Sequence, residues 1–213
     1  MYNYLLFDLD GTLTMSEQGI VNSVIYALNE MGIKEYDREK LKVFIGPPLE
    51  ESFMKYYGLD TKDAKKAIEY YRVYYKAKGI FEAPLYQGVK ETLEALKNMG
   101  KKLYVATSKP EVFAKKILEH WEIDNFFEDV VGSNLDGTKV NKDEVISSLL
   151  ENNNISDKSK VVMVGDRKHD VLGGKKMGVA TVGVLYGYGN LEELENAGAD
   201  RIIEKISDII NIV

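Results

Sequence analysis

Four short runs of apolar residues, each continuous rather than alternating with polar residues, recur along the chain. Runs of this kind are typical of strands buried on both faces, as in a parallel sheet that helices cover on both sides. Amphipathic helical patterns separate them, which favours a doubly wound α/β fold. The runs lie at Tyr4–Phe7, Leu103–Ala106, Val161–Val164 and Thr181–Val184, and the expected helices at Gly88–Met99, Pro110–His120, Lys142–Glu151 and Val171–Met177.

Residues 15 to 82 break this pattern, because they show helical periodicity and no run that resembles a strand. The periodicity predicts three helices, around residues 20–28, 49–57 and 67–75. The insert leaves the sheet directly after the first strand, and the chain is expected to return at Ala83–Leu85. We therefore expect an α/β core of residues 1–14 and 83–213 and a helical insert of residues 15–82.

The composition argues against some classes of binding partner. A net charge of -6 and a pI near 5.2 argue against a protein that holds nucleic acid by neutralising its phosphates. The absence of Cys excludes disulfide and thiolate chemistry. We find no pattern of a signal peptide and no apolar segment long enough to cross a bilayer. These features predict a cytoplasmic monomer or small homo-oligomer without nucleic-acid or membrane partners.

Polar residues follow three of the expected strands at the point where each strand ends. The carboxyl ends of parallel strands meet at one edge of a sheet, where ligands of open α/β sheets bind. Another candidate, a lysine, opens the helix before the third of these strands. The candidate residues are Asp8, Asp10, Thr107, Ser108, Lys142, Asp166 and Asp170.

Several carboxylates within a few ångströms raise one another's pKa unless a counter-charge is present. Mg²⁺ fits best, since it prefers oxygen ligands and the sequence offers no His or Cys cluster for zinc. A phosphate ester held there would present its phosphorus to Asp8, while Lys142 and the Thr107 hydroxyl neutralise the other oxygens. Asp10 would then protonate the leaving oxygen and later activate water. The pattern predicts a small phosphorylated metabolite as substrate.

The same residues carry a resemblance to a known family. Phe7–Thr14 reads Phe-Asp-Leu-Asp-Gly-Thr-Leu-Thr and resembles the first motif of the haloacid dehalogenase-like hydrolase superfamily. Val105–Lys109 is similar to its second motif, Lys142 occupies the place of its third-motif lysine, and Val164–Asp170 resembles the fourth. The motifs occur in the expected order and cover the whole chain.

This resemblance implies a Rossmann-like core and a role for each residue. Asp8 would be the nucleophile and Asp10 the acid and base, with Thr107, Ser108 and Lys142 binding phosphate. Asp166 would bind Mg²⁺ beside Asp8 and the backbone carbonyl of Asp10, and Asp170 would support the metal through water. The helical insert resembles the cap of the phosphoglycolate phosphatase and 5′-nucleotidase branch, which closes over the substrate and provides specificity.

Two features of the insert bear on this resemblance. Gly46, Pro47, Pro48 and Leu49 are similar to a cap segment of nucleotidase and phosphoglycolate phosphatase relatives, and they are equally explained by a stiff turn before a helix. Where relatives often carry Asp-Ser after the first motif, this chain has Met15-Ser16, and Ser16 is expected to cap the first insert helix.

Other activities stay open at this point. A phosphosugar mutase would share all of the core motifs. A 2-haloacid dehalogenase would share the nucleophile, but displacing halide from carbon needs neither Mg²⁺ nor the second acid, Asp10. A non-catalytic phospho-binding module would be expected to have lost at least one of these groups. The sequence does not decide what Lys109 and His169 do.

Overall fold

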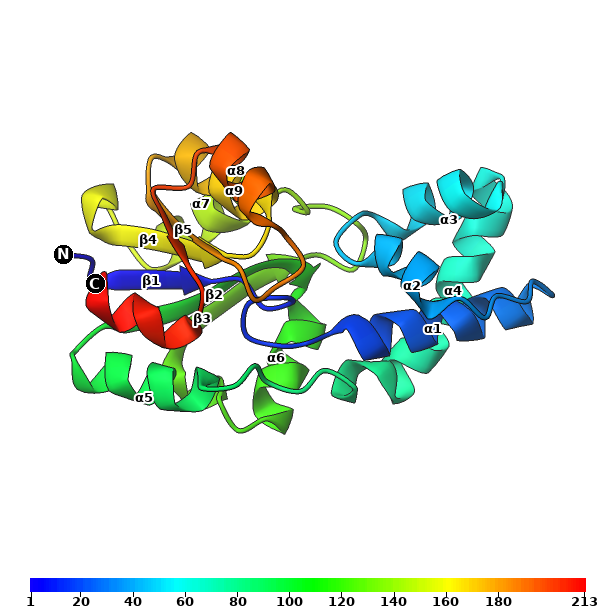
Figure 1. Ribbon diagram of the computed structural model, residues 1–213, viewed down its shortest axis with the longest axis horizontal. Coiled ribbons are helices and arrows are strands. Elements are labelled where there is room, and N and C mark those ends of the chain that lie inside the picture. The colour runs from blue at the N-terminus through cyan, green and yellow to red at the C-terminus, as the bar shows by residue number, and fades with distance from the viewer. The chain divides into compact units, whose positions relative to one another are not determined.

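Six parallel strands form a single sheet in the order β3-β2-β1-β4-β5-β6 in the computed structural model, which describes residues 1–213 (Figure 1). The expected doubly wound parallel sheet is therefore confirmed. The strands are β1 (Tyr4–Phe7), β2 (Lys102–Pro110), β3 (Phe127–Ser133), β4 (Val161–Gly165), β5 (Ala180–Val184) and β6 (Arg201–Ile203).

The strand order places the first strand at the centre of the sheet. Phe7 of β1 lies opposite Val105 of β2 on one side and opposite Val164 of β4 on the other. The chain builds outward from β1 to β3, and then returns to β4 and builds in the other direction. The reversal lies between β1 and β4, and ligands of such sheets usually bind beyond the carboxyl ends of the strands at this point.

Helices cover both faces of this sheet. Figure 1 shows α7 and α8 on one side and α5 and α6 on the other, in agreement with their contacts to the strands. One more α-helix and three short 3₁₀ helices complete this part of the chain. The helices are α5 (Val89–Asn98), α6 (Glu111–His120), α7 (Lys142–Asn152), α8 (Lys168–Met177), α9 (Leu191–Ala197), η3 (Asp124–Phe126), η4 (Lys158–Lys160) and η5 (Ile206–Asn211).

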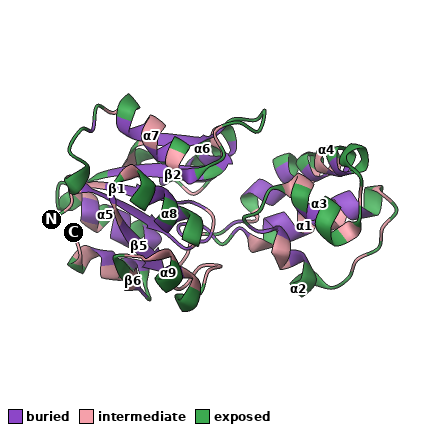
Figure 2. Ribbon diagram, turned by 90° about the horizontal axis from the view of Figure 1, so that it is seen from above, coloured by how far each residue is buried: buried purple, intermediate pink, exposed green.

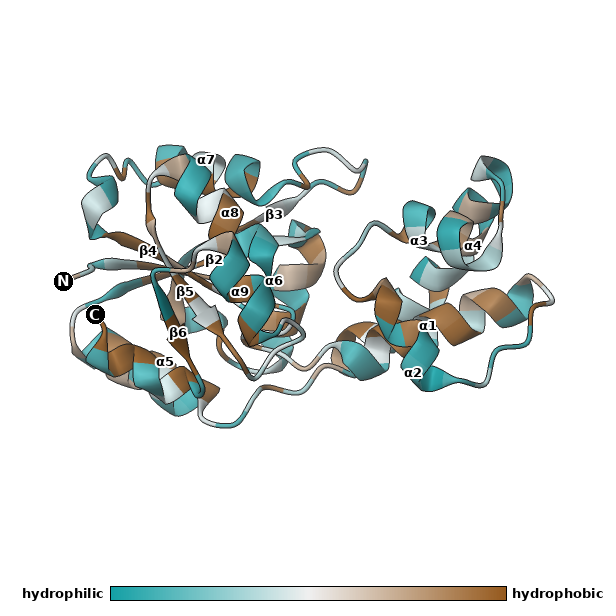
Figure 3. Cartoon of the chain, turned by 45° about the horizontal axis from the view of Figure 1, so that its top comes forward, coloured by the Kyte–Doolittle hydropathy of each residue, from teal (hydrophilic) through white to brown (hydrophobic).

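The core of the sheet follows from the alternation of side chains along each strand. Leu6, Tyr104 and Met163 point to one face, where they pack with Ile146 and Leu149 of α7. Leu5 and Phe7 are fully buried and point to the opposite face. The strands therefore appear as buried and hydrophobic ribbons between helices whose outer surfaces are exposed and polar (Figures 2 and 3).

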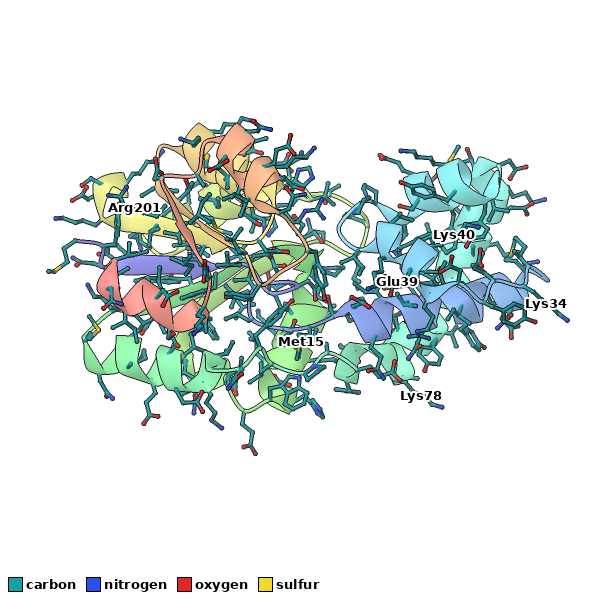
Figure 4. All side chains as sticks on the ribbon, viewed as in Figure 1. Met15, Lys34, Glu39, Lys40, Lys78 and Arg201 are labelled. Carbon is teal, nitrogen blue, oxygen red and sulfur yellow. The ribbon has the colours of Figure 1, made fainter.

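The chain divides into two compact units, one of Met1–Met15 with Leu85–Val213 and one of Ser16–Pro84. In the second unit α1 packs against α4, and Lys34 lies in the loop beyond the end of α1 (Figure 4). A Cβ atom on Gly19 would lie 2.0 Å from the carbonyl oxygen of Gly79, so both segments need glycine at this crossing. The helices are α1 (Glu17–Glu30), α2 (Arg38–Leu41), η1 (Lys42–Phe44), α3 (Leu49–Tyr57), α4 (Thr61–Ala77) and η2 (Gly79–Phe81).

The structure also contains elements that the sequence patterns did not predict, namely β3, β6 and α2. The prediction that the Ser16 side chain caps α1 is wrong. Ser16 occupies the N-cap position of α1, but its side chain makes no capping hydrogen bond. Ser16 has αR backbone angles there rather than the extended angles usual for a capping side chain. None of the helices in either unit has both the length and the apolar character that a membrane span requires.

Candidate active site

Three carboxylates, two directly after neighbouring strands and one in the first turn of α8, meet beyond the carboxyl ends of β1 and β4. Asp8 directly follows β1 and its N–H donates to the Val164 carbonyl of β4 at 2.9 Å, so both strand ends are joined there. Asp166 directly follows β4. One oxygen atom from each of Asp8, Asp166 and Asp170 lies within 4.8 Å of the others. The sheet thus brings together residues that are more than 150 positions apart in the sequence.

Asp170 reaches this cluster because of how α8 begins. Its carboxylate accepts a hydrogen bond from the Arg167 backbone N–H at 3.1 Å, which turns the side chain back toward the first turn of the helix. Gly165 leaves the necessary room, since a Cβ atom there would lie 2.2 Å from Asp170 Cγ. Asp170 is consequently buried, with 2% of its surface exposed.

Lys142 is the cation of the cluster. As the first residue of α7 it is buried, and its Nζ lies 2.9 Å from Asp8 Oδ1 and 2.8 Å from Asp170 Oδ1. It also donates to the Ala106 carbonyl of β2 at 3.0 Å. Burial by itself would lower the pKa of Lys142, but the charges of Asp170 and Asp8 outweigh it and raise the pKa above its usual value. Lys142 therefore stays charged.

One ammonium group does not balance three carboxylates. Burial raises the pKa of Asp166 to about 8, and the charges of Asp170 and Asp8 act in the same direction. Its Oδ2 accepts the Tyr188 N–H at 2.7 Å, whereas its Oδ1 is buried without a hydrogen-bond partner. An unpartnered carboxylate oxygen beside two further carboxylates is the donor set that a hard divalent cation needs. The residues present therefore fit Mg²⁺.

Asp10 is not part of this cluster of three. Its carboxylate forms a close ion pair with Nζ of Lys109, which is buried. The structure therefore places Lys109 beside the second acid of the first motif. The sequence patterns did not find this partnership, because the two residues lie 99 positions apart and only the pairing of β1 with β2 joins them.

Thr107 and Ser108 lie inside β2 rather than beyond it. The pairing of β2 with β3 shifts register between Ala106 and Pro110, as in a β-bulge, and a bulge redirects side chains. Thr107 is buried and its hydroxyl accepts the Lys109 N–H at 3.2 Å, while Ser108 is exposed. Gly132 of β3 permits the bulge, because a Cβ atom there would lie 2.5 Å from the Lys109 carbonyl oxygen.

Two further sets of candidates are not among the three clustered carboxylates. His169, in the first turn of α8, is exposed and is not among the three clustered carboxylates. Gly46, Pro47 and Pro48 are exposed residues of the second unit, and Leu49 begins α3. Gly46 has a φ of 101°, which favours glycine. That this segment determines substrate specificity stays a prediction.

Comparison with known proteins agrees with this geometry. The family model of the haloacid dehalogenase-like hydrolases matches residues 5–184. A 5′-nucleotidase from Pseudomonas aeruginosa is 46% identical over 91% of this chain and 87% of its own length. The crystal structure of a predicted phosphatase from Clostridium acetobutylicum, 48% identical, superposes on 100% of this chain and 98% of its own with a TM-score of 0.92.

A third relative carries a different name. The tyrosine-protein kinase PtkA of Mycobacterium tuberculosis is 38% identical over 90% of this chain and 65% of its own length. The family match, the structural similarity and the order of the motifs nevertheless agree. The chain therefore belongs to the haloacid dehalogenase-like hydrolases and, within them, to the phosphatases.

Proposed function

We propose that this phosphatase is Mg²⁺-dependent and hydrolyses a small phosphate monoester, a 5′-nucleotide or a phosphoglycolate-like ester, through an aspartyl-phosphate on Asp8. The observation that carries the proposal is the meeting of Asp8, Asp166 and Asp170 within 4.8 Å, with Lys142 bridging two of them. The 46% identical relative named a 5′-nucleotidase supports the substrate class.

The two half-reactions divide between the two acids of the first motif. A carboxylate oxygen of Asp8 attacks phosphorus, and the bond from phosphorus to the ester oxygen breaks as Asp10 gives that oxygen its proton. Asp10 then takes a proton from a water molecule, which attacks the phosphorus of the aspartyl-phosphate. Inorganic phosphate leaves and the Asp8 carboxylate is restored.

The other residues of the site would hold the metal ion and the phosphoryl group. Asp8, Asp166 and the backbone carbonyl of Asp10 would hold Mg²⁺, with Asp170 supporting it through water. When bound, Mg²⁺ neutralises charge on the phosphoryl oxygens. Lys142 together with Thr107 and Ser108 would bind the remaining phosphoryl oxygens.

The proposal is tested by measuring phosphate release from nucleoside 5′-monophosphates, phosphoglycolate and sugar phosphates, with Mg²⁺ and with EDTA. We expect release from at least one of the first two classes that requires Mg²⁺. A phosphosugar mutase would instead convert a sugar 1-phosphate into its isomer without releasing phosphate. Unchanged activity in EDTA would contradict the metal part of the proposal, and an absence of phosphate release from every ester would contradict the whole of it.

Lys109 offers a sharper test of the role of Asp10. Because Lys109 Nζ is the ion-pair partner that holds the Asp10 side chain in place, replacing Lys109 by Met is expected to displace that side chain and so to impair protonation of the leaving oxygen. In the first half-reaction alkyl esters depend on that proton and should lose about 100-fold in the single-turnover rate of alcohol release, while the same rate for p-nitrophenyl phosphate should change by less than about 5-fold. The control is Lys115→Met, which breaks an exposed ion pair with Glu111 on α6. Equal losses in this single-turnover rate on all esters would assign Lys109 to phosphate binding instead.

A further inference from the structure

The segment Tyr186–Gly189, which follows β5, contacts both loops that carry the acids, although it belongs to none of the four motifs. The Tyr188 N–H donates to Asp166 Oδ2 at 2.7 Å. The Tyr186 hydroxyl donates to the Thr12 carbonyl at 3.0 Å. One short segment thus joins the loop after β4 to the loop after β1.

The two glycines of this segment lie against the same loops with no room for a side chain. A Cβ atom on Gly187 would lie 2.3 Å from Asp166 Cβ and 2.4 Å from the Gly11 carbonyl oxygen. A Cβ atom on Gly189 would lie 2.0 Å from the Asp166 carbonyl oxygen. Neither glycine is among those with positive φ, so the requirement is for space rather than for an unusual backbone conformation.

Both ends of the segment are anchored. The N–H of Leu185, just before it, donates to the Ile203 carbonyl of β6 at 2.9 Å. Just after it, the Asn190 side chain caps α9 by accepting the Glu193 N–H at 2.9 Å. Glu193 in turn accepts a hydrogen bond from Arg167 Nε at 2.8 Å, next to Asp166. The segment is therefore held by β6 and α9 against the loop that carries Asp166.

The aromatic ring of Tyr186, at the start of the segment, contacts the ring of Tyr86 edge to face, with 4.8 Å between the ring centroids. This contact holds the ring independently of the hydroxyl. The hydrogen bond to Thr12 can consequently be removed while the ring stays packed.

We infer that the segment Tyr186–Gly189 positions the Asp166 carboxylate and thereby sets the affinity of the acidic site for a divalent cation, without contacting the cation itself. The Tyr188 N–H is hydrogen-bonded to Oδ2 of Asp166, so the buried and unpartnered Oδ1 is left for the metal. Hydrogen-bonding partners of this kind fix the orientation of a ligand and raise metal affinity. The inference rests on the metal part of the proposed function.

Gly187→Ala tests it through Mg²⁺ affinity measured by titration calorimetry on the full chain, without substrate. We expect binding to weaken about 10- to 100-fold, the usual effect of disturbing a partner of a metal ligand. The matched control is Gly19→Ala, which places a Cβ atom 2.0 Å from a carbonyl oxygen in the second unit. This control should leave Mg²⁺ affinity within about 2-fold of the wild-type protein.

Tyr186→Phe is a milder second variant, which keeps the ring contact and loses only the hydrogen bond to Thr12. We expect about 3- to 10-fold weaker Mg²⁺ binding, the change that follows from the loss of one such bond. Its control is Tyr74→Phe, which loses a 3.1 Å hydrogen bond to Glu82 in the second unit and should bind Mg²⁺ normally.

The outcomes separate this inference from the proposed function. The inference is supported when Tyr186→Phe and folded Gly187→Ala both bind Mg²⁺ more weakly than the wild-type protein does, while the two control variants bind it normally. Wild-type affinity in either variant overturns it and leaves the proposed function intact. A wild-type protein that binds no Mg²⁺ overturns both the inference and the metal part of the proposed function.

Discussion

Replacing Asp8 by Asn is expected to reduce phosphate release by about 10⁴-fold or more, the scale seen when a catalytic nucleophile is removed. The amide keeps the size of the carboxylate but cannot form the acyl-phosphate bond. Substrate turnover is measured as released phosphate under saturating Mg²⁺. Asp124→Asn, at an exposed position outside the acidic site, is the matched control and should keep full activity.

The same variant should fold with a stability close to that of the wild-type protein. The Asp8 charge helps to raise the pKa of both Asp166 and Asp170, so its removal relieves repulsion between buried carboxylates. The loss of the ion pair with Lys142 acts in the opposite direction, and Asp170 remains as a partner of Lys142. We therefore expect a Tm in EDTA close to that of the wild-type protein for Asp8→Asn. Turnover near the wild-type rate in a folded Asp8→Asn protein would exclude Asp8 as the nucleophile.

Without metal, the stability of the folded protein is expected to fall as the pH rises. Burial raises the pKa of Asp166 from 3.8 to about 8, and burial also raises that of Asp170 to about 6. The folded protein therefore binds these protons more tightly than the unfolded chain does. The stabilisation is complete below about pH 4 and is lost as the pH rises through these folded-state values.

Above pH 6.5 the change is expected to come mainly from Asp166. Burial lowers the pKa of His169 below its usual 6.5, with the charges of Arg167 and Lys168 acting in the same direction, so that residue titrates below this range. The free energy of unfolding in EDTA should fall by about 2 kcal/mol between about pH 6.5 and 8. Mg²⁺ favours the ionised carboxylates, so its stabilising effect should grow over the same range. Thermal unfolding in EDTA and in Mg²⁺ across this range measures both effects.

Asp166→Asn provides the control for this prediction, because the amide cannot ionise. Its Tm in EDTA should vary much less between about pH 6.5 and 8, and Mg²⁺ should raise it far less than in the wild-type protein. A wild-type protein whose Tm in EDTA rises over this interval would contradict the direction given for Asp166. An equal effect of Mg²⁺ on both proteins would exclude Asp166 as a ligand.

Much of the core could be predicted because the information is local. The expected strand at Tyr4–Phe7 has the bounds of β1, and those at Val161–Val164 and Thr181–Val184 each fall short of their strands by one residue. A strand buried on both faces needs an uninterrupted apolar run, which a reader can see in the sequence. The acids directly after β1 and β4 follow from the same pattern, because strand ends meet at one edge.

Elements at the margin of the sheet do not carry this local signal. In β3, an edge strand, Glu128 and Asp129 interrupt the apolar run, because Glu128 is exposed and Asp129 only half-buried at the margin of the sheet. The other edge strand, β6, has only three residues and begins with the exposed Arg201. Such strands are defined by their hydrogen bonds to a neighbour rather than by composition.

By itself the sequence determined the parallel α/β core, the helical character of residues 15–82 and which acids stand at the ends of β1 and β4. Only the tertiary structure decided that Lys142 bridges Asp8 and Asp170, that Lys109 pairs with Asp10, and that Gly187 packs against Asp166. The physical reason is distance along the chain. Apolar patterning is read over neighbouring residues, whereas an ion pair or a close backbone approach exists only once the strands have brought remote segments together.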